Sequence, residues 1–121
     1  MSEELMEHSH KIHIEKAVKG YPSDEKIEAL AKFYQNFASK RRMEILFCLM
    51  EGEMGVCCIA EMLSCEQSLI SHQLKILKEG KLVDSRREGK MIYYFLADNH
   101  IKNIVSIGFE HLGEKNNEKI G

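Results

Sequence analysis

The 121-residue sequence has no long apolar run. No stretch approaches the roughly 18 apolar residues that a membrane helix needs, and the acidic first seven residues lack an apolar signal core. These absences predict a cytoplasmic protein with no membrane partner. The sequence also lacks a nucleophile elbow, a phosphate loop and a general-base motif, so we expect neither an enzyme nor a small-molecule substrate.

Cysteine is scarce as well. The chain has four cysteines, at Cys48, Cys57, Cys58 and Cys65. In an intracellular chain this usage favours free thiols or metal ligands over a disulfide framework. Cys48 falls within an apolar helical run and is predicted to lie in the core, while Cys65 is expected to be inert packing.

The chain carries little net charge, −2 at neutral pH, so nothing global indicates nucleic acid as a partner. The distribution is less even. Residues 66–96 contain six basic and four acidic residues, so this stretch carries +2 and the remainder −4. A solvated face would look similar, and the imbalance therefore needs support from motifs.

The length fits one domain with short extensions. We predict a flexible N-terminal arm over 1–21, a folded domain over 22–115 and a disordered tail over 116–121. The arm contains three histidines, His8, His10 and His13.

Two helices are predicted in the first half of the domain. Ser23 is expected to cap the first, whose apolar stripe is a candidate dimer surface. Ser39 is expected to cap the second, which contains Cys48 and ends by Gly52. The stripe consists of Ile27, Leu30, Ala31, Tyr34 and Phe37.

Two further helices follow, at about 56–63 and 66–79, with Gly80 as the stop of the latter. Either a capping box of Ser64 with Gln67 or Glu66 marks where the second of them begins. Its inward face is predicted to contain Leu69, Ile70, Leu74 and Leu77.

The apolar period then changes from about 3.6 to 2. Segments 82–86 and 91–96 flank the turn 87–90 and predict a β-hairpin with a basic tip. Two short helices followed by such a hairpin predict a winged helix-turn-helix in a mainly α chain.

The outward face of the second helix of this pair is rich in short polar side chains, which suit contacts to DNA bases, and basic hairpin residues suit phosphates or the minor groove. An ordinary solvated face is the alternative. The candidate DNA-binding residues are Gln67, Ser68, Ser71, His72 and Lys75 on the helix and Arg86, Arg87 and Lys90 on the hairpin.

Four metal-ligand side chains stand near the end of the chain: Asp98, His100, His111 and Glu114. On one helix from about 99 to 115, the two histidines share a face but lie about 16 Å apart along the axis, so one ion cannot touch both. Asp98 with His100 forms one half of a site, and His111 with Glu114 forms the other half. In a dimer with a second, antiparallel copy of the helix, each half of one chain would meet the opposite half of its partner, which completes two four-ligand shells. Two imidazoles and two carboxylates suit zinc and would accept cobalt. By spacing alone, the same residues could simply decorate an amphipathic helix.

The block 67–77, the wing 86–94 and the terminal pattern Asp-x-His, ten residues, His-x-x-Glu together resemble the ArsR/SmtB family of metal-sensing repressors, in the branch with zinc between paired C-terminal helices. This resemblance covers about residues 24–115. It implies a two-fold symmetric homodimer that binds a palindromic operator when metal-free and releases it on binding zinc, one ion per chain.

Other branches of this family bind soft metals through a Cys-Val-Cys-Asp run, whereas the corresponding segment here is Gly55-Val56-Cys57-Cys58. The match is partial, and adjacent helical residues project about 100° apart. Cys57 or Cys58 could join His8, His10 or His13 of the other subunit in a second site. The resemblance therefore leaves a cadmium, lead or arsenic sensor that uses Cys57 or Cys58 as the alternative function. Apart from the resemblance, the histidine arm would also suit a cytoplasmic zinc carrier, which is a third possible function.

Overall fold

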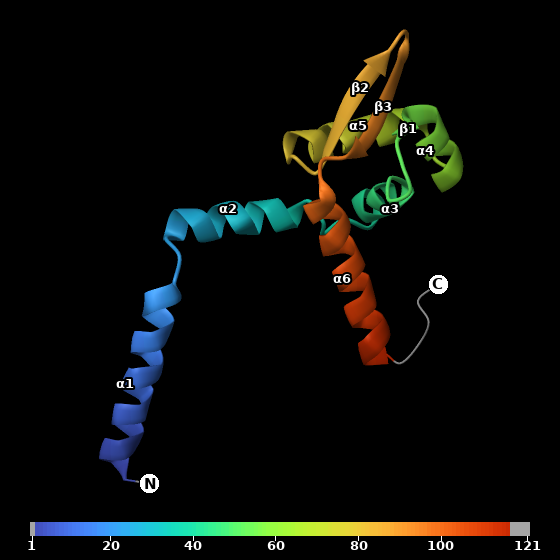
Figure 1. The fold of residues 1–121 in the computed structure, drawn as a ribbon. Coiled ribbons are helices and arrows are strands. Elements are labelled where there is room, and N and C mark those ends of the chain that lie inside the picture. Colours follow the sequence, from blue (N-terminus) through green and yellow to red (C-terminus); the bar gives the residue numbers. More distant parts are fainter. Residues whose placement is uncertain (1, 117–121) are drawn as a thin grey trace. The chain divides into compact units, whose positions relative to one another are not determined.

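The structure is a computed structural model that describes residues 2–116, with side chains described through residue 114. The chain divides into two compact units, Met1–Lys32 and Phe33–Gly121. None of the described helices is long and apolar enough to cross a membrane. The elements in chain order are α1 (Glu3–Gly20), α2 (Asp24–Gln35), α3 (Lys40–Cys48), β1 (Met54–Gly55), α4 (Val56–Leu63), α5 (Gln67–Glu79), β2 (Val83–Glu88), β3 (Met91–Leu96) and α6 (Asn99–Asn116) (Figure 1).

Helix α1 occupies a segment for which the sequence analysis predicted no regular element. The Ser2 hydroxyl accepts a hydrogen bond from the Leu5 backbone N–H at 3.3 Å, and Glu3 and Glu4 place negative charge at the positive end of the helix dipole. No residue of α1 is buried. Local capping therefore accounts for a helix that packing does not require, and its role as an arm stays a prediction.

The two predicted serine caps are confirmed. The Ser23 hydroxyl accepts from the Lys26 N–H and the Ser39 hydroxyl from the Arg42 N–H, both at 3.3 Å. Helix α3 ends at Cys48, before the predicted limit at Gly52, and Cys48 is buried in the core as predicted.

One apolar core lies in the second unit, where α3, α4, α5, β2 and α6 contribute side chains. Three of the four predicted inward residues of α5 are fully buried, but Leu69 is 39% exposed and its prediction was wrong. Ile70, Leu74 and Leu77 define the buried face of α5, and Leu69 projects about 100° away from Ile70, on the side of the helix that is exposed with Ser68 and His72. The buried residues are Ile45, Leu46, Cys48, Leu49, Ile59, Ala60, Ile70, Leu74, Leu77, Leu82, Val83, Ile101 and Val105.

The connection between α4 and α5 differs from the predicted capping box. Ser64 adopts a left-handed conformation (φ 52°) and is the C-cap of α4. Glu66 is the N-cap of α5, and its side chain makes no capping hydrogen bond. The alternative start at Glu66 is therefore confirmed, because Ser64 closes the preceding helix instead of opening this one.

Gly80 follows α5 as its C-cap, as predicted, but in a right-handed conformation. The left-handed residue is Lys81, with φ 66°. A Cβ atom at position 80 would lie 2.6 Å from Nδ2 of Asn36, so a larger residue there would displace the end of that side chain, whereas the backbone conformation itself does not call for glycine.

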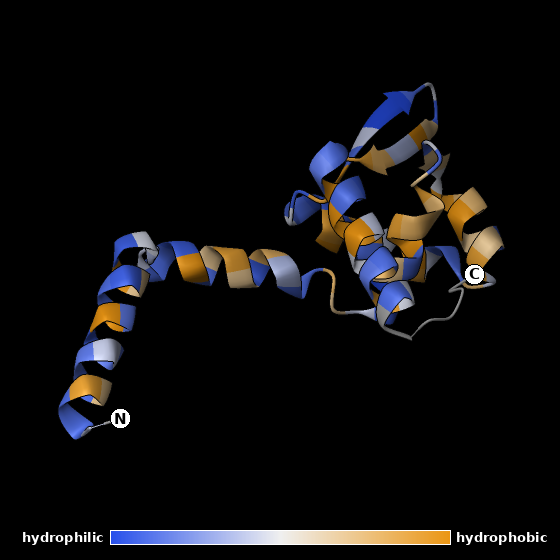
Figure 2. Cartoon of the chain, turned by 60° about the horizontal axis from the view of Figure 1, so that its bottom comes forward, coloured by the Kyte–Doolittle hydropathy of each residue, from blue (hydrophilic) through white to orange (hydrophobic). Residues whose placement is uncertain are grey.

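The three strands form an antiparallel sheet in the order β1-β3-β2. Strands β2 and β3 remain paired to Glu88 and Met91, so the hairpin turn is Gly89–Lys90 and not the predicted four residues. Gly89 has φ 62°, which the first central position of a type II′ turn requires. Strand β2 is largely hydrophilic and β3 largely hydrophobic (Figure 2).

Helix α6 begins beside Asp98, whose Oδ1 accepts from the N–H groups of His100 at 2.9 Å and Ile101 at 3.3 Å. Ile101 and Val105 anchor the helix in the core. The helix continues to Asn116, the first residue of the predicted tail, and the rest of that tail, 117–121, lies outside the described residues.

Candidate nucleic-acid interface and metal ligands

The predicted DNA-binding face of α5 lies opposite the face that the helix buries in the core. Ile70, Leu74 and Leu77 are fully buried, which turns the opposite side of the helix to solvent. All five predicted reading residues are exposed, namely Gln67, Ser68, Ser71, His72 and Lys75. Side chains that contact base edges must be exposed, and these five are. Their binding to DNA stays a prediction.

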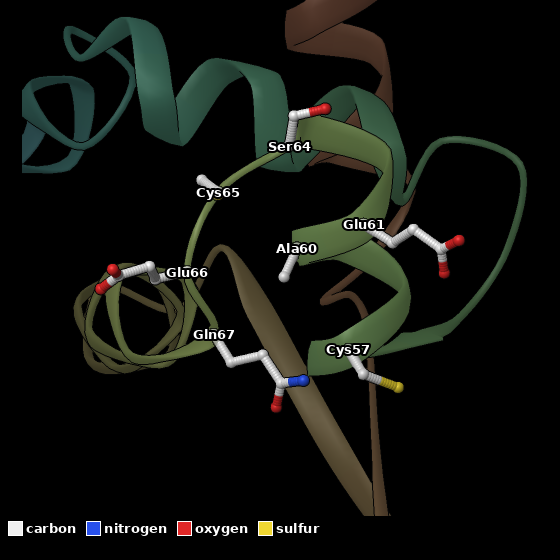
Figure 3. Close-up of a pocket in the computed structure, with 7 residues that line it drawn as sticks. All are labelled: Cys57, Ala60, Glu61, Ser64, Cys65, Glu66 and Gln67. Atoms are coloured by element: carbon white, nitrogen blue, oxygen red, sulfur yellow. The ribbon is translucent and has the colours of Figure 1, made fainter.

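A pocket of about 570 Å³ lies between α4 and the start of α5. The side chains of Cys57 and Gln67 project from the first turns of the two helices, and Glu61 and Glu66 add negative charge (Figure 3). Glu66 was predicted only as a possible helix start, and Glu61 was not predicted at all, because an acid on a helix surface is common. The lining residues are Cys57, Ala60, Glu61, Ser64, Cys65, Glu66 and Gln67.

A second hollow, of about 260 Å³, lies between the helix-turn-helix formed by α4 and α5 and the β2–β3 hairpin. It is lined by Gln67 and Cys57 on one side and by Lys90, Met91 and Ile92 on the other. The predicted base-reading residue Gln67 and the predicted wing contact Lys90 therefore border the same space, as two parts of one interface would.

The two wing arginines lie on opposite faces of β2, because successive strand residues alternate. Ser85 accepts a hydrogen bond from Lys78 Nζ of α5 at 2.7 Å, so the face that Ser85 shares with Arg87 is turned toward the recognition helix. Arg87 Nε donates to the Gly89 carbonyl at 3.1 Å. Arg86 projects to the other face.

Arg86 is held by two carboxylates. It forms ion pairs with Glu53 and with Glu88, the latter at 2.9 Å. Hydrogen bonds to these carboxylates raise the pKa of the Arg86 guanidinium, and the bond from Arg86 lowers the pKa of Glu53. Glu53 was missed by sequence reasoning, since it is far from Arg86 along the chain.

The four predicted metal ligands are all exposed on or beside α6. The structure brings Asp98 and His100 together, with Oδ1 3.4 Å from Nδ1. His111 and Glu114 lie on the last turns of the helix. Among the described residues no three or more histidine, cysteine or acidic side chains gather closely enough to hold a metal ion, so one chain does not bring the four predicted ligands together.

His111 also borders an apolar groove of about 400 Å³ between α6 and the α2–α3 region. The Phe47 and Phe109 rings meet edge to face in this region, with centroids 5.5 Å apart. The lining comprises Tyr34, Phe37, Met43, Phe47, Ile104, Val105, Gly108, Phe109, His111 and Leu112. A predicted ligand thus stands at the edge of an apolar surface.

Cys57 and Cys58 are exposed at the start of α4, in the second unit. The neighbouring Cys57 is the main cause of a raised pKa at the Cys58 thiol. The arm histidines His8, His10 and His13 are exposed on α1, in the first unit. A shared site of these groups across two subunits stays a prediction.

Comparison with known proteins identifies the class. Residues 39–85, from the start of α3 into β2, match the family described as bacterial regulatory protein, arsR family. A transcriptional repressor SmtB homolog of Synechocystis is 34% identical over 85% of this chain and 80% of its own. A cadmium resistance regulatory protein CadC homolog of Staphylococcus aureus is 35% identical over 70% of this chain and 71% of its own.

The fold comparison agrees. A homodimeric winged helix-turn-helix DNA-binding domain of Mycobacterium bovis, a possible ArsR-family regulator, superposes with a TM-score of 0.68 and 31% identity, over 78% of this chain and 94% of that one. The fold is therefore a winged helix-turn-helix, and the homologues that share it are DNA-binding transcriptional regulators, not enzymes. The chain belongs to the arsR family of bacterial regulatory proteins.

Proposed function

We propose that this chain is a metal-responsive transcriptional repressor that binds operator DNA as a homodimer in the cytoplasm and releases the DNA when zinc binds. Its relatives include proteins named for repression and for cadmium resistance, which supports a metal effector. The observation that carries the zinc proposal is that α6 exposes a contacting Asp98–His100 pair at one end and His111 with Glu114 at the other.

The proposed dimer places the apolar groove beside α6 against a second copy. Several large apolar side chains of this region are exposed in one chain, including Ile107 at 65% and Leu112 at 55%. Burying such a surface between two copies is favourable at about 25 cal/mol per Å² of apolar area. A similar fold is homodimeric in the Mycobacterium bovis domain.

In this dimer the Asp98–His100 pair of one protomer meets His111 and Glu114 of its partner. The donor set fits zinc, and cobalt second, because two imidazoles and two carboxylates complete a tetrahedral shell. Oδ1 of Asp98 accepts hydrogen bonds from two backbone N–H groups at the start of α6, which fixes the carboxylate beside the helix. A complete protein shell favours a regulatory ion over a catalytic one.

Zinc bound in this way would fix the angle between the two helix-turn-helix motifs of the dimer. A palindromic operator needs the two α5 helices about one helical turn of DNA apart. We propose that the zinc-bound dimer does not have this spacing, so that metal and DNA favour different dimer geometries. Their antagonism is then reciprocal, because any factor that zinc removes from DNA affinity is removed by DNA from zinc affinity.

The test is a gel shift with the DNA upstream of the gene for this protein, with and without Zn²⁺. His100→Gln and His111→Gln should abolish zinc-driven release and leave the metal-free affinity nearly unchanged. Glu110→Gln, an exposed acid of α6 outside the ligand set, is the matched control. Loss of metal-free binding in both histidine variants would contradict a regulatory site.

A soft-metal sensor is the second candidate, because Cys57 and Cys58 are both exposed. Cadmium or lead thiolates absorb in the near ultraviolet, whereas zinc on nitrogen and oxygen does not. Absorption that Cys57→Ser and Cys58→Ser remove, with release of DNA by cadmium alone, would favour this candidate. Zinc binding without any operator binding would instead indicate a zinc carrier.

A further inference from the structure

Given the proposed operator binding, on which this step rests, we propose that Arg86 is a positioning residue for the wing. It fastens the hairpin to the loop that precedes β1, and it leaves the phosphate contacts of the wing to Arg87 and Lys90. Two adjacent arginines that look equivalent in the sequence then have different tasks.

Each of the three guanidinium nitrogens of Arg86 already donates to a carboxylate, which uses three of its five N–H groups. Nε donates to Glu53 Oε2 at 2.9 Å, Nη2 bonds Glu53 Oε1, and Nη1 donates to Glu88 Oε2 at 2.9 Å. A bidentate pair of this kind fixes the plane of the guanidinium as well as its position. Two carboxylates around one cation also leave a local charge of −1, which repels a DNA phosphate.

One face of the same guanidinium is covered by an aromatic ring. Cζ of Arg86 lies 4.8 Å from the ring centroid of Tyr93, its cross-strand partner on β3. A cation over a tyrosine ring is attracted to the negative face of the ring. The carboxylates therefore hold the edge of the guanidinium and Tyr93 holds its face.

The ion pair between Arg86 and Glu53 runs across the sheet, and this direction shows which two segments it holds together. Strand order is β1-β3-β2, so Arg86 of β2 reaches across β3 to Glu53, in the loop that leads into β1. The ion pair spans the width of the sheet. The side chains of Arg86 and Glu53 are 45% and 39% exposed, and exposed pairs contribute little to global stability. Their removal should therefore loosen the wing without unfolding the chain.

The experiment measures affinity against salt concentration for a duplex that the wild-type protein selects from a random pool. Each phosphate contact contributes about 0.9 to the slope of log affinity against log salt. Arg87→Gln, the neighbour on the opposite face, should lower the slope by about that amount. Arg86→Gln should weaken binding about fivefold and leave the slope unchanged.

Rescue distinguishes positioning from contact. In a Glu88→Gln background, which removes the carboxylate that would repel a glutamate at position 86, the charge-swapped variant Glu53→Arg/Arg86→Glu should restore most of the affinity that Arg86→Glu loses, because the ion pair between positions 53 and 86 is rebuilt with reversed polarity. Glu53→Gln should behave like Arg86→Gln. Equal melting temperatures confirm that each variant is folded.

Three results would overturn the assignment: a slope lowered in Arg86→Gln as in Arg87→Gln, no rescue in the swap, or a tighter and more salt-dependent complex for Glu53→Gln. The last would mean that Glu53 withholds Arg86 from DNA. A wild-type protein that selects no duplex would overturn the proposed function itself, before any variant is compared.

Discussion

Arg42 Nη1 donates a hydrogen bond to Gln73 Oε1 at 3.3 Å and so joins α3 to the recognition helix. The same guanidinium donates from Nε to the Asn36 carbonyl at 3.0 Å and from Nη2 to the Gln35 carbonyl at 3.3 Å. One side chain therefore connects the end of α2 with α5.

Replacing Arg42 with glutamine should lower the free energy of unfolding by about 1–3 kcal/mol, since the partly buried Asn36 carbonyl and Gln73 side chain lose a charged donor. Urea unfolding measures this. Arg41→Gln is the control: Arg41 has one ion pair, to Glu44 at 3.5 Å, and should change stability by less than about 0.5 kcal/mol. Equal losses in the two variants would argue against the linking role of Arg42.

Ser71→Ala and His72→Ala should relax sequence preference more than they weaken non-specific binding. A lost base contact costs about 1–3 kcal/mol on the preferred sequence and little on random DNA. Affinities for the selected duplex and for a scrambled one give the comparison. Losses of the same size on both duplexes would remove these residues from base reading.

The thiols should differ in their reaction with an alkylating reagent. Cys57 and Cys58 are exposed and should react in the folded protein, whereas Cys48 is buried, and burial raises its thiol pKa. Because Cys57 raises the pKa of Cys58, Cys57→Ser should speed modification of Cys58 near neutral pH. Mass spectrometry of the peptides resolves the sites. Unchanged Cys58 kinetics would show that the neighbouring thiol has no influence.

The ion pair on the wing should persist in mild acid. Hydrogen bonding from Arg86 lowers the pKa of Glu53, so the contribution of Glu53 is present above its unfolded pKa and is lost only as pH falls through the lower folded value. An NMR titration of the Glu53 carboxyl should give a midpoint below the ordinary 4.5 of a glutamate. Arg86→Gln should return the midpoint upward. A normal midpoint in the wild type would mean that the pair does not form in solution.

Local signals in the sequence were enough for the helices of the core unit and for the hairpin. The caps Ser23 and Ser39 and the strand at 91–96 each depend on neighbours in the chain, and the structure confirms them. Strand β1 was missed because two residues are too few to show a period of 2. The helix α1 was missed because its sequence contains no apolar face that packing would bury.

Contacts between distant residues could not be predicted in the same way. Glu53 and Arg86 are 33 positions apart, and Arg42 and Gln73 are 31 apart, so no periodic pattern relates them. The reading face of α5 was predictable because the buried positions of one helix determine its exposed ones. The two halves of the proposed metal site were predictable as spacings, whereas their meeting depends on a second chain.

The close approach of Gly80 to Asn36 links the evolutionary freedom of two positions that are far apart in the sequence. A lineage that acquires any larger residue at 80 must also displace or shorten the side chain at 36, whereas Lys81 shows that the next position tolerates a bulky residue despite its left-handed backbone. Positions 36 and 80 should therefore vary together among descendants of this sequence, whereas position 81 should stay restricted to residues that accept a positive φ.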